Sequence, residues 1–151
     1  MIYLEKHNPK LRNIFLIEKT HIIQNLQNCL EIHHIGSTAI VGILAKPIVD
    51  ILAVVFDISQ VGEIDGYESH GEYGMLGRRY FTKDGFHLHV FQKGAKEIVD
   101  MRFFVEYLNA NPKIAKEYEN LKVKLAKIHT DANKYANAKT EFINNILSRT
   151  I

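Results

Sequence analysis

The sequence predicts an α+β fold, in which helices pack on a mixed β-sheet and the C-terminal segment is helical. Strand-like runs gather between residues 31 and 92, and helical periodicity dominates before and after them. Segregated strands and helices are typical of α+β proteins. The length of 151 residues fits one domain. We therefore expect a single domain over residues 1–151, with the first helix and the sheet in residues 1–94 and helices in residues 95–151.

The N-terminal part predicts one helix followed by five strands. Apolar residues recur at helical spacing over residues 9–28, after the helix-start pair Asn8-Pro9. A loop with a helical turn is expected at residues 38–46, and a short helix at residues 60–64. Strands are expected at residues 31–35, 48–56, 67–73, 78–82 and 86–92. Residues 48–56 are apolar on both faces, which predicts an interior strand.

Three helices are expected after Gly94. They cover residues 96–109, residues 113–128 and a last segment capped by Asp131. The lysines of the second helix are spread around its circumference, which is typical of a solvated face rather than a nucleic-acid-binding stripe. They are Lys113, Lys116, Lys122, Lys124 and Lys127.

Composition and charge exclude several classes of partner. The net charge is +2 with neutral histidines, too small to predict nucleic-acid binding. No apolar run reaches the roughly 18 residues of a membrane helix, and no signal-peptide core is visible. The single cysteine, Cys29, excludes a disulfide framework within the chain. These features predict a cytoplasmic protein without a membrane partner.

A Gly-Ser turn and a lone carboxylate flank the loop before the interior strand. Backbone N–H groups at Gly36-Ser37 can hold a phosphate, although such a pair is also a common plain turn. Asp50 opens an apolar strand, where an unpaired buried carboxylate is costly. We expect Asp50 to lie at the solvent edge, to pair with Lys46 or to bind a metal.

His87 and His89 lie two residues apart on a predicted strand, so both face one side of the sheet. Two imidazoles so placed form a metal-binding pair, a proton-transfer pair or two solvated histidines. The preceding residues Arg78 and Arg79 face opposite ways. One of them can therefore reach a phosphate while the other is solvated.

The stretch HIGSTAIVGILAKPIVDI, residues 34–51, resembles the signature of the GrpB family, a bacterial branch of the nucleotidyltransferase superfamily. In that family His-Ile-Gly-Ser-Thr is followed by Pro-Gly, by Ala-Lys-Pro and by Asp, and Val41 stands here where proline is usual. The stretches GRRYF at residues 77–81 and HLHVF at residues 87–91 are similar to its strand motifs. The resemblance extends over nearly the whole chain.

The resemblance implies a nucleotidyltransferase-type fold, with a nucleotide or phosphorylated small molecule as partner and a nucleoside triphosphate as substrate. Catalysis and binding of a divalent metal ion, Mn²⁺, Zn²⁺ or Mg²⁺, are expected at Asp50, His87 and His89. Glu31 and His34 are expected to orient these ligands. The expected phosphate- or nucleotide-binding residues are Gly36, Ser37, Thr38, Lys46, Arg78, Arg79 and Lys139.

Two departures bear on activity. Active members of the superfamily carry a second acid two residues after the first, where this chain has Leu52. One carboxylate with two imidazoles favours Mn, Fe, Ni or Zn over magnesium, which prefers oxygen ligands. Val105 replaces an arginine that is usual in the family, and Arg102 lies on a similar face of the predicted helix.

Three functions fit these residues. The first is transfer of a nucleotidyl group to an unknown acceptor with a divalent metal. The second is a catalytically inactive nucleotide-binding, phosphate-binding or sensor module, and the third is a metal-dependent hydrolase that uses the same cleft. Leu52 favours the second and third, whereas the retained glycine, aspartate and histidine motifs favour the first.

Overall fold

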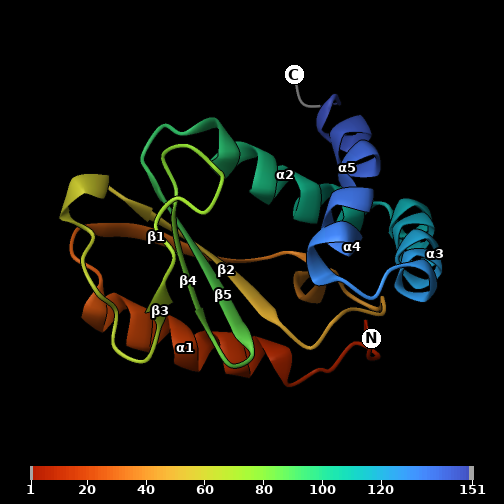
Figure 1. The fold of residues 1–151 in the computed structure, drawn as a ribbon, viewed down its shortest axis with the longest axis horizontal. Coiled ribbons are helices and arrows are strands. Elements are labelled where there is room, and N and C mark those ends of the chain that lie inside the picture. Colours follow the sequence, from red (N-terminus) through yellow and green to blue (C-terminus); the bar gives the residue numbers. More distant parts are fainter. Residues whose placement is uncertain (1, 150–151) are drawn as a thin grey trace.

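A five-stranded mixed sheet forms the centre of the structure, in the order β1-β2-β5-β4-β3 (Figure 1). The strands are β1 (Cys29–Ile35), β2 (Val49–Val55), β3 (Glu68–Ser69), β4 (Arg79–Lys83) and β5 (Phe86–Gln92). β2 and β5 run parallel, and the other neighbouring pairs are antiparallel. The computed structural model describes residues 2–149, so residues 1, 150 and 151 of the predicted domain lie outside it. The α+β class is confirmed.

Helices cover both faces of the sheet (Figure 1). α1 (Leu11–Asn25) lies on one face and α2 (Lys96–Ala110) on the other. The remaining helices gather beside α2, and they are α3 (Pro112–Ile128), α4 (Ala132–Ala138) and α5 (Thr140–Leu147). No helix within residues 2–149 is long and apolar enough to cross a membrane.

Alternation along the interior strands decides which side chains face α2. In β2, Ile51, Ala53 and Val55 belong to the core beneath α1, whereas Leu52 and Val54 pack in the cluster beneath α2. Asp50 has the same parity as Leu52 and therefore lies on the α2 face. β2 lies inside the sheet as predicted, between β1 and β5, and both of its faces are buried because α1 packs on one and α2 on the other.

The same alternation in β5 separates its apolar residues from its histidines. Leu88 and Val90 pack in the core beneath α1. His87 and His89 therefore share the α2 face with Asp50.

Several expected elements differ from the structure. The predicted strand at residues 67–73 is regular only at Glu68–Ser69, because Gly71 and Gly74 adopt positive φ angles and turn the chain into a loop. The predicted helix at residues 60–64 is a single 3₁₀ turn at Ile58–Gln60. The N-terminal helix is shorter than residues 9–28.

The last helix is divided into α4 and α5, which meet at Lys139. Asp131 caps α4 as predicted, since its carboxylate accepts hydrogen bonds from the backbone N–H groups of Asn133 and Lys134.

Candidate functional site

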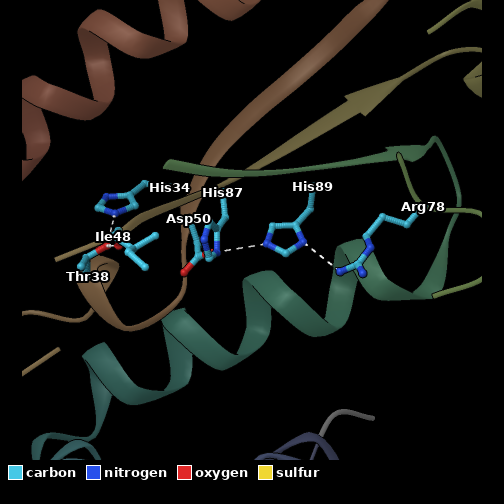
Figure 2. A network of polar contacts seen from close by, with 7 residues as sticks. All are labelled: His34, Thr38, Ile48, Asp50, Arg78, His87 and His89. Carbon is cyan, nitrogen blue, oxygen red and sulfur yellow. Dashed lines mark hydrogen bonds and ion pairs between the residues drawn. The ribbon is translucent and has the colours of Figure 1, made fainter. Parts of the chain in front are cut away.

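Asp50, His87 and His89 meet on the α2 face of the sheet (Figure 2). In the parallel register of β2 and β5, Asp50 pairs with His87, and Leu52 pairs with His89. The Oδ1 atom of Asp50 lies 3.5 Å from Nδ1 of His87 and 3.4 Å from Nε2 of His89. Two neighbouring strands thus bring together the three residues that were predicted to be catalytic.

The two imidazoles keep the carboxylate charged. Burial favours the neutral acid and would raise the pKa of Asp50. Hydrogen bonds and charge interactions with His87 and His89 outweigh burial and hold the pKa of Asp50 well below its usual range. Asp50 is therefore an anion at neutral pH that accepts hydrogen bonds from both rings.

Arg78 fixes the tautomer of His89. The Nη1 atom of Arg78 lies 3.3 Å from Nδ1 of His89. Because a guanidinium only donates hydrogen bonds, Nδ1 must accept, and the ring proton of neutral His89 sits on Nε2, towards Asp50. The guanidinium is itself held by the backbone carbonyls of Glu72 and Tyr73. Both ring nitrogens of His89 are thus occupied.

His87 has a free ring nitrogen. Its Nδ1 faces Asp50, whereas its Nε2 has no hydrogen-bond partner within residues 2–149. An Nδ1–H group that donates to Asp50 leaves Nε2 able to exchange a proton with a ligand. A carboxylate that orients a histidine in this way is a recurring arrangement in acid–base catalysis.

Gly36 allows Asp50 to lie against the loop after β1. Its φ angle is +73°, and a Cβ atom added there would lie 2.7 Å from Oδ2 of Asp50. We expected Gly36 to admit a ligand phosphate. The close approach in the structure is that of the Asp50 carboxylate, so a side chain at position 36 would displace the central group of the site.

Two cavities meet at Asp50, and Ser37, Asp50 and Lys139 line both. The first, termed the lysine cavity, has a volume of about 260 Å³. Its lining includes the three lysines Lys46, Lys122 and Lys139, together with His87 and Tyr135. Among the described residues that line it, only Asp50 is acidic, so this cavity favours anions.

The second, termed the α2 cavity, has a volume of about 410 Å³. It is largely apolar and also acidic, and its lining includes Met75, Met101, Phe104, Ile143, Glu97 and Asp100. His89 lines this cavity. Asp50 therefore has one imidazole in each cavity.

Ser37 and Thr38 have different environments. Ser37 lines both cavities, and its Oγ donates to the hydroxyl of Tyr118 at 3.4 Å. Thr38 is buried beneath the loop, where it donates to the carbonyl of Ile48 and accepts from Nε2 of His34 (Figure 2). Burial lowers the pKa of His34 to about 4, so this ring is neutral. Thr38 supports the loop from outside the two cavities.

Arg79 also lies outside the two cavities. It pairs with Val90 in the β4–β5 ladder, and Val90 belongs to the α1 face. Arg78 points the other way and contacts His89. The two arginines therefore face opposite sides, as their adjacent positions predicted.

Residues expected to assist the site from a distance contact other partners. Glu31 pairs with His33 and Arg102, and neither Glu31 nor His34 bonds to Asp50, His87 or His89. Arg102 pairs with Glu31 and Glu106 outside both cavities. Val105 packs in the apolar cluster around Leu52. Arg102 therefore reaches neither cavity.

Lys122 corrects the expectation of a solvated helix face. It is 1% exposed, and its ammonium donates to the carbonyl of Leu44. Burial, assisted by the charges of Lys139 and Lys46, lowers the pKa of Lys122 to about 7. Its spacing, four residues after Tyr118, carried the signal of an inward position.

The predicted metal triad gains no support from this arrangement. Within residues 2–149, no group of three or more His, Cys, Asp or Glu side chains is arranged to hold a metal ion. His87 and His89 each direct a ring nitrogen at one carboxylate oxygen of Asp50, at hydrogen-bond distance. The three groups form a hydrogen-bonded network.

Comparison with known proteins places the chain in a family. The family described as GrpB protein matches residues 1–149. The chain belongs to the GrpB family. The UPF0157 protein YqkA of Bacillus subtilis is 44% identical over 125 residues, and the match covers 76% of this chain but only 36% of that protein. The glutamate-rich protein GrpB of Alkalihalophilus pseudofirmus is 32% identical over 165 residues, covering 97% and 94% of the two chains.

A solved structure is similar to this GrpB-family chain along nearly its whole length. The crystal structure of conserved protein GrpB from Enterococcus faecalis superposes with a TM-score of 0.89 at 36% sequence identity. The match covers 97% of this chain and 95% of that one. The sheet and both helical layers are therefore shared with that GrpB protein.

Proposed function

We propose that this protein is a nucleotidyltransferase-type enzyme in which His87, oriented by Asp50, is the acid–base residue. The observation that carries the proposal is the free Nε2 atom of His87 beside the lysine cavity, with Nδ1 on an ionised carboxylate. An acid–base group positioned in this way typically contributes about 10²–10⁴-fold to a rate.

In the proposed reaction, the hydroxyl oxygen of an acceptor attacks the α-phosphorus of a nucleoside triphosphate. The bond from the α-phosphorus to the bridging oxygen breaks, and diphosphate leaves. His87 donates a proton to the departing oxygen, because it lines the same cavity as the lysines, and the acceptor proton passes to solvent. Lys46 and Lys139 stabilise the negative charge that develops.

The two cavities give the nucleotide an orientation. Phosphates are favoured among the lysines, and the apolar lining around Met101 and Phe104 favours a base or an apolar acceptor. Ser37 lines both cavities, so its hydroxyl is available near the α-phosphate, where the two parts of the nucleotide join.

The test is release of diphosphate from each nucleoside triphosphate, with water and with a panel of hydroxyl compounds as acceptors. We expect Asp50→Asn and His87→Gln to reduce the rate about 10²–10⁴-fold while bound nucleotide remains detectable. Release at the wild-type rate by both variants would rule out the acid–base assignment.

A nucleotide-binding module without catalysis is the second candidate. Leu52, at the place of the second acid, is fully buried in the apolar cluster with Val54 and Phe91. Nucleotide binding by the wild type without any turnover would favour this module. Hydrolysis with water alone would favour the hydrolase.

A further inference from the structure

The lysine cavity holds charged groups that the acid–base chemistry does not use. We propose that Lys46, Lys122 and Lys139, with Tyr135 beneath them, form a subsite for a multiply charged phosphate group, the diphosphate end of a nucleotide. The naming of the occupant rests on the proposed function, whereas the subsite itself rests on the geometry of the cavity. It adds Lys122 and Tyr135 to the residues that contact the ligand.

Three distant segments bring these lysines together. Lys46 comes from the loop before β2, Lys122 from α3 and Lys139 from the junction of α4 and α5. The ammonium groups of Lys139 and Lys46 lie 4.7 and 5.4 Å from the centre of the Tyr135 ring. None of the three lysines forms an ion pair within residues 2–149. The aromatic ring stabilises the cations without neutralising them.

The unpaired charges act on one another. Burial lowers the pKa of all three lysines, and the charge of Lys139 further lowers the pKa values of Lys46 and Lys122. Lys122 faces the charges of Lys139 and Lys46, which lower its pKa, and that of Glu119, which raises it. The ring of Tyr118 also lies 5.0 Å from its ammonium. An anion in the cavity would offset this repulsion and favour the charged form of each lysine.

Tyr135 provides independent evidence for the subsite. Its side chain is 1% exposed and lines the lysine cavity. Its hydroxyl is the buried side-chain polar atom that has no hydrogen-bond partner within the described residues. Buried polar groups are normally paired, so an exception points to a missing ligand, ion or water. A phosphate oxygen would provide the partner.

The charge balance selects the class of anion. Three lysines face one carboxylate across the cavity, Asp50, so an occupant with two or more negative charges complements it better than a monoanion. The volume of about 260 Å³ is well above one water molecule, whose share of the liquid is about 30 Å³. Both features fit a phosphate or diphosphate.

The experiment is isothermal titration calorimetry of the full chain with inorganic diphosphate and, separately, with inorganic phosphate. We expect Lys122→Met to weaken diphosphate binding at least about tenfold and Tyr135→Phe to weaken it a few-fold, as befits a lost charge and a lost neutral hydrogen bond. The matched control Lys113→Met removes an exposed lysine of the same helix and should bind as the wild type.

Proton uptake provides a second readout. With its pKa near 7, Lys122 is largely neutral at pH 8 in the free protein and becomes charged when the anion binds. The binding heat of the wild type should therefore depend on the ionisation enthalpy of the buffer at pH 8, in proportion to an uptake of up to one proton. This dependence should be smaller in Lys122→Met.

The outcomes separate the subsite from the proposed function. Wild-type affinity for diphosphate in Lys122→Met or in Tyr135→Phe would overturn the subsite, and Tyr135→Phe alone decides if Lys122→Met does not fold. Diphosphate binding that depends on both residues, in a protein that turns over no nucleotide, would support the subsite and contradict the transferase. Nucleotide turnover together with unaffected diphosphate binding in both variants would contradict the subsite and support the transferase.

Discussion

The lysine cavity and the α2 cavity share Asp50 but have opposite character. The lysine cavity is lined by three lysines and one carboxylate, whereas the α2 cavity adds Glu97 and Asp100 to a largely apolar lining. Each contains one imidazole of the Asp50 network. A ligand that spans both cavities therefore has only one favourable orientation, with its anionic end among the lysines.

The two histidines also differ from each other, in what contacts the second ring nitrogen of each. They share a strand, a face and a carboxylate oxygen. Arg78 occupies the second nitrogen of His89, whereas no group among residues 2–149 hydrogen-bonds to that of His87. Identical residues two positions apart therefore have different environments. In the proposed function His87 is the acid–base residue, whereas His89 hydrogen-bonds to both Arg78 and Asp50.

The largest expected effect separates these two histidines. His87→Gln should lower kcat for diphosphate release by about 10²–10⁴-fold, because the acid–base group is lost. His89→Gln should have a smaller effect, since glutamine can still hydrogen-bond and both ring nitrogens of His89 already have protein partners. Steady-state kinetics of both variants provide the measurement. Equal losses of kcat would remove the distinction between the two rings.

Glycine substitutions test the position of Asp50 between the cavities. Gly36→Ala should lose about 1–3 kcal/mol of unfolding free energy from backbone strain, with a further loss because the Cβ atom would meet Oδ2 of Asp50. The control Gly42→Ala also has positive φ, but among residues 2–149 no heavy atom beyond its two chain neighbours lies within 4 Å of its added Cβ. Urea unfolding should rank Gly36→Ala as the less stable, and diphosphate release should fall only there. Equal stability of the two variants would contradict the contact.

The charge of the lysine cavity should appear in the pH dependence of stability. Lys122 has a pKa of about 7 when folded and 10.5 as its ordinary value. Between these values the unfolded chain binds more protons, so the unfolding free energy should rise with pH from about 7 to 10.5. Lys122→Met should show a flatter profile in urea unfolding across this range. The same slope in both proteins would mean that folding does not lower the pKa of Lys122.

Metal titration is expected to give the smallest effect, and it tests whether Asp50 is a metal ligand. We expect weak binding of Mn²⁺, Zn²⁺ and Mg²⁺ to the chelator-treated protein, because His87 and His89 each direct a ring nitrogen at Asp50. Tight binding of Mn²⁺ or Zn²⁺ that is lost in Asp50→Ala, His87→Ala and His89→Ala would instead restore the predicted metal triad.

Local sequence patterns predicted much of the site, because side-chain alternation in a strand is a property of the backbone. The spacing of His87 and His89 placed them on one face, and the apolar run around Asp50 placed its strand inside the sheet. Lys122 was assigned wrongly, because it was grouped with the other lysines of its helix although its spacing from Tyr118 indicates an inward position. Lys122 is buried because α3 packs against the loop that contains Leu44.

Strand order, cavities and protonation depend on contacts between distant segments. The parallel pairing of β2 with β5 puts Asp50 beside His87, although 37 residues separate them in the chain. The tautomer of His89 depends on the loop that carries Arg78, and the close approach of Gly36 to Asp50 depends on the pairing of β1 with β2. Periodicity reports which way a side chain points, whereas hydrogen bonds and charge interactions act through space and follow from how the segments pack together.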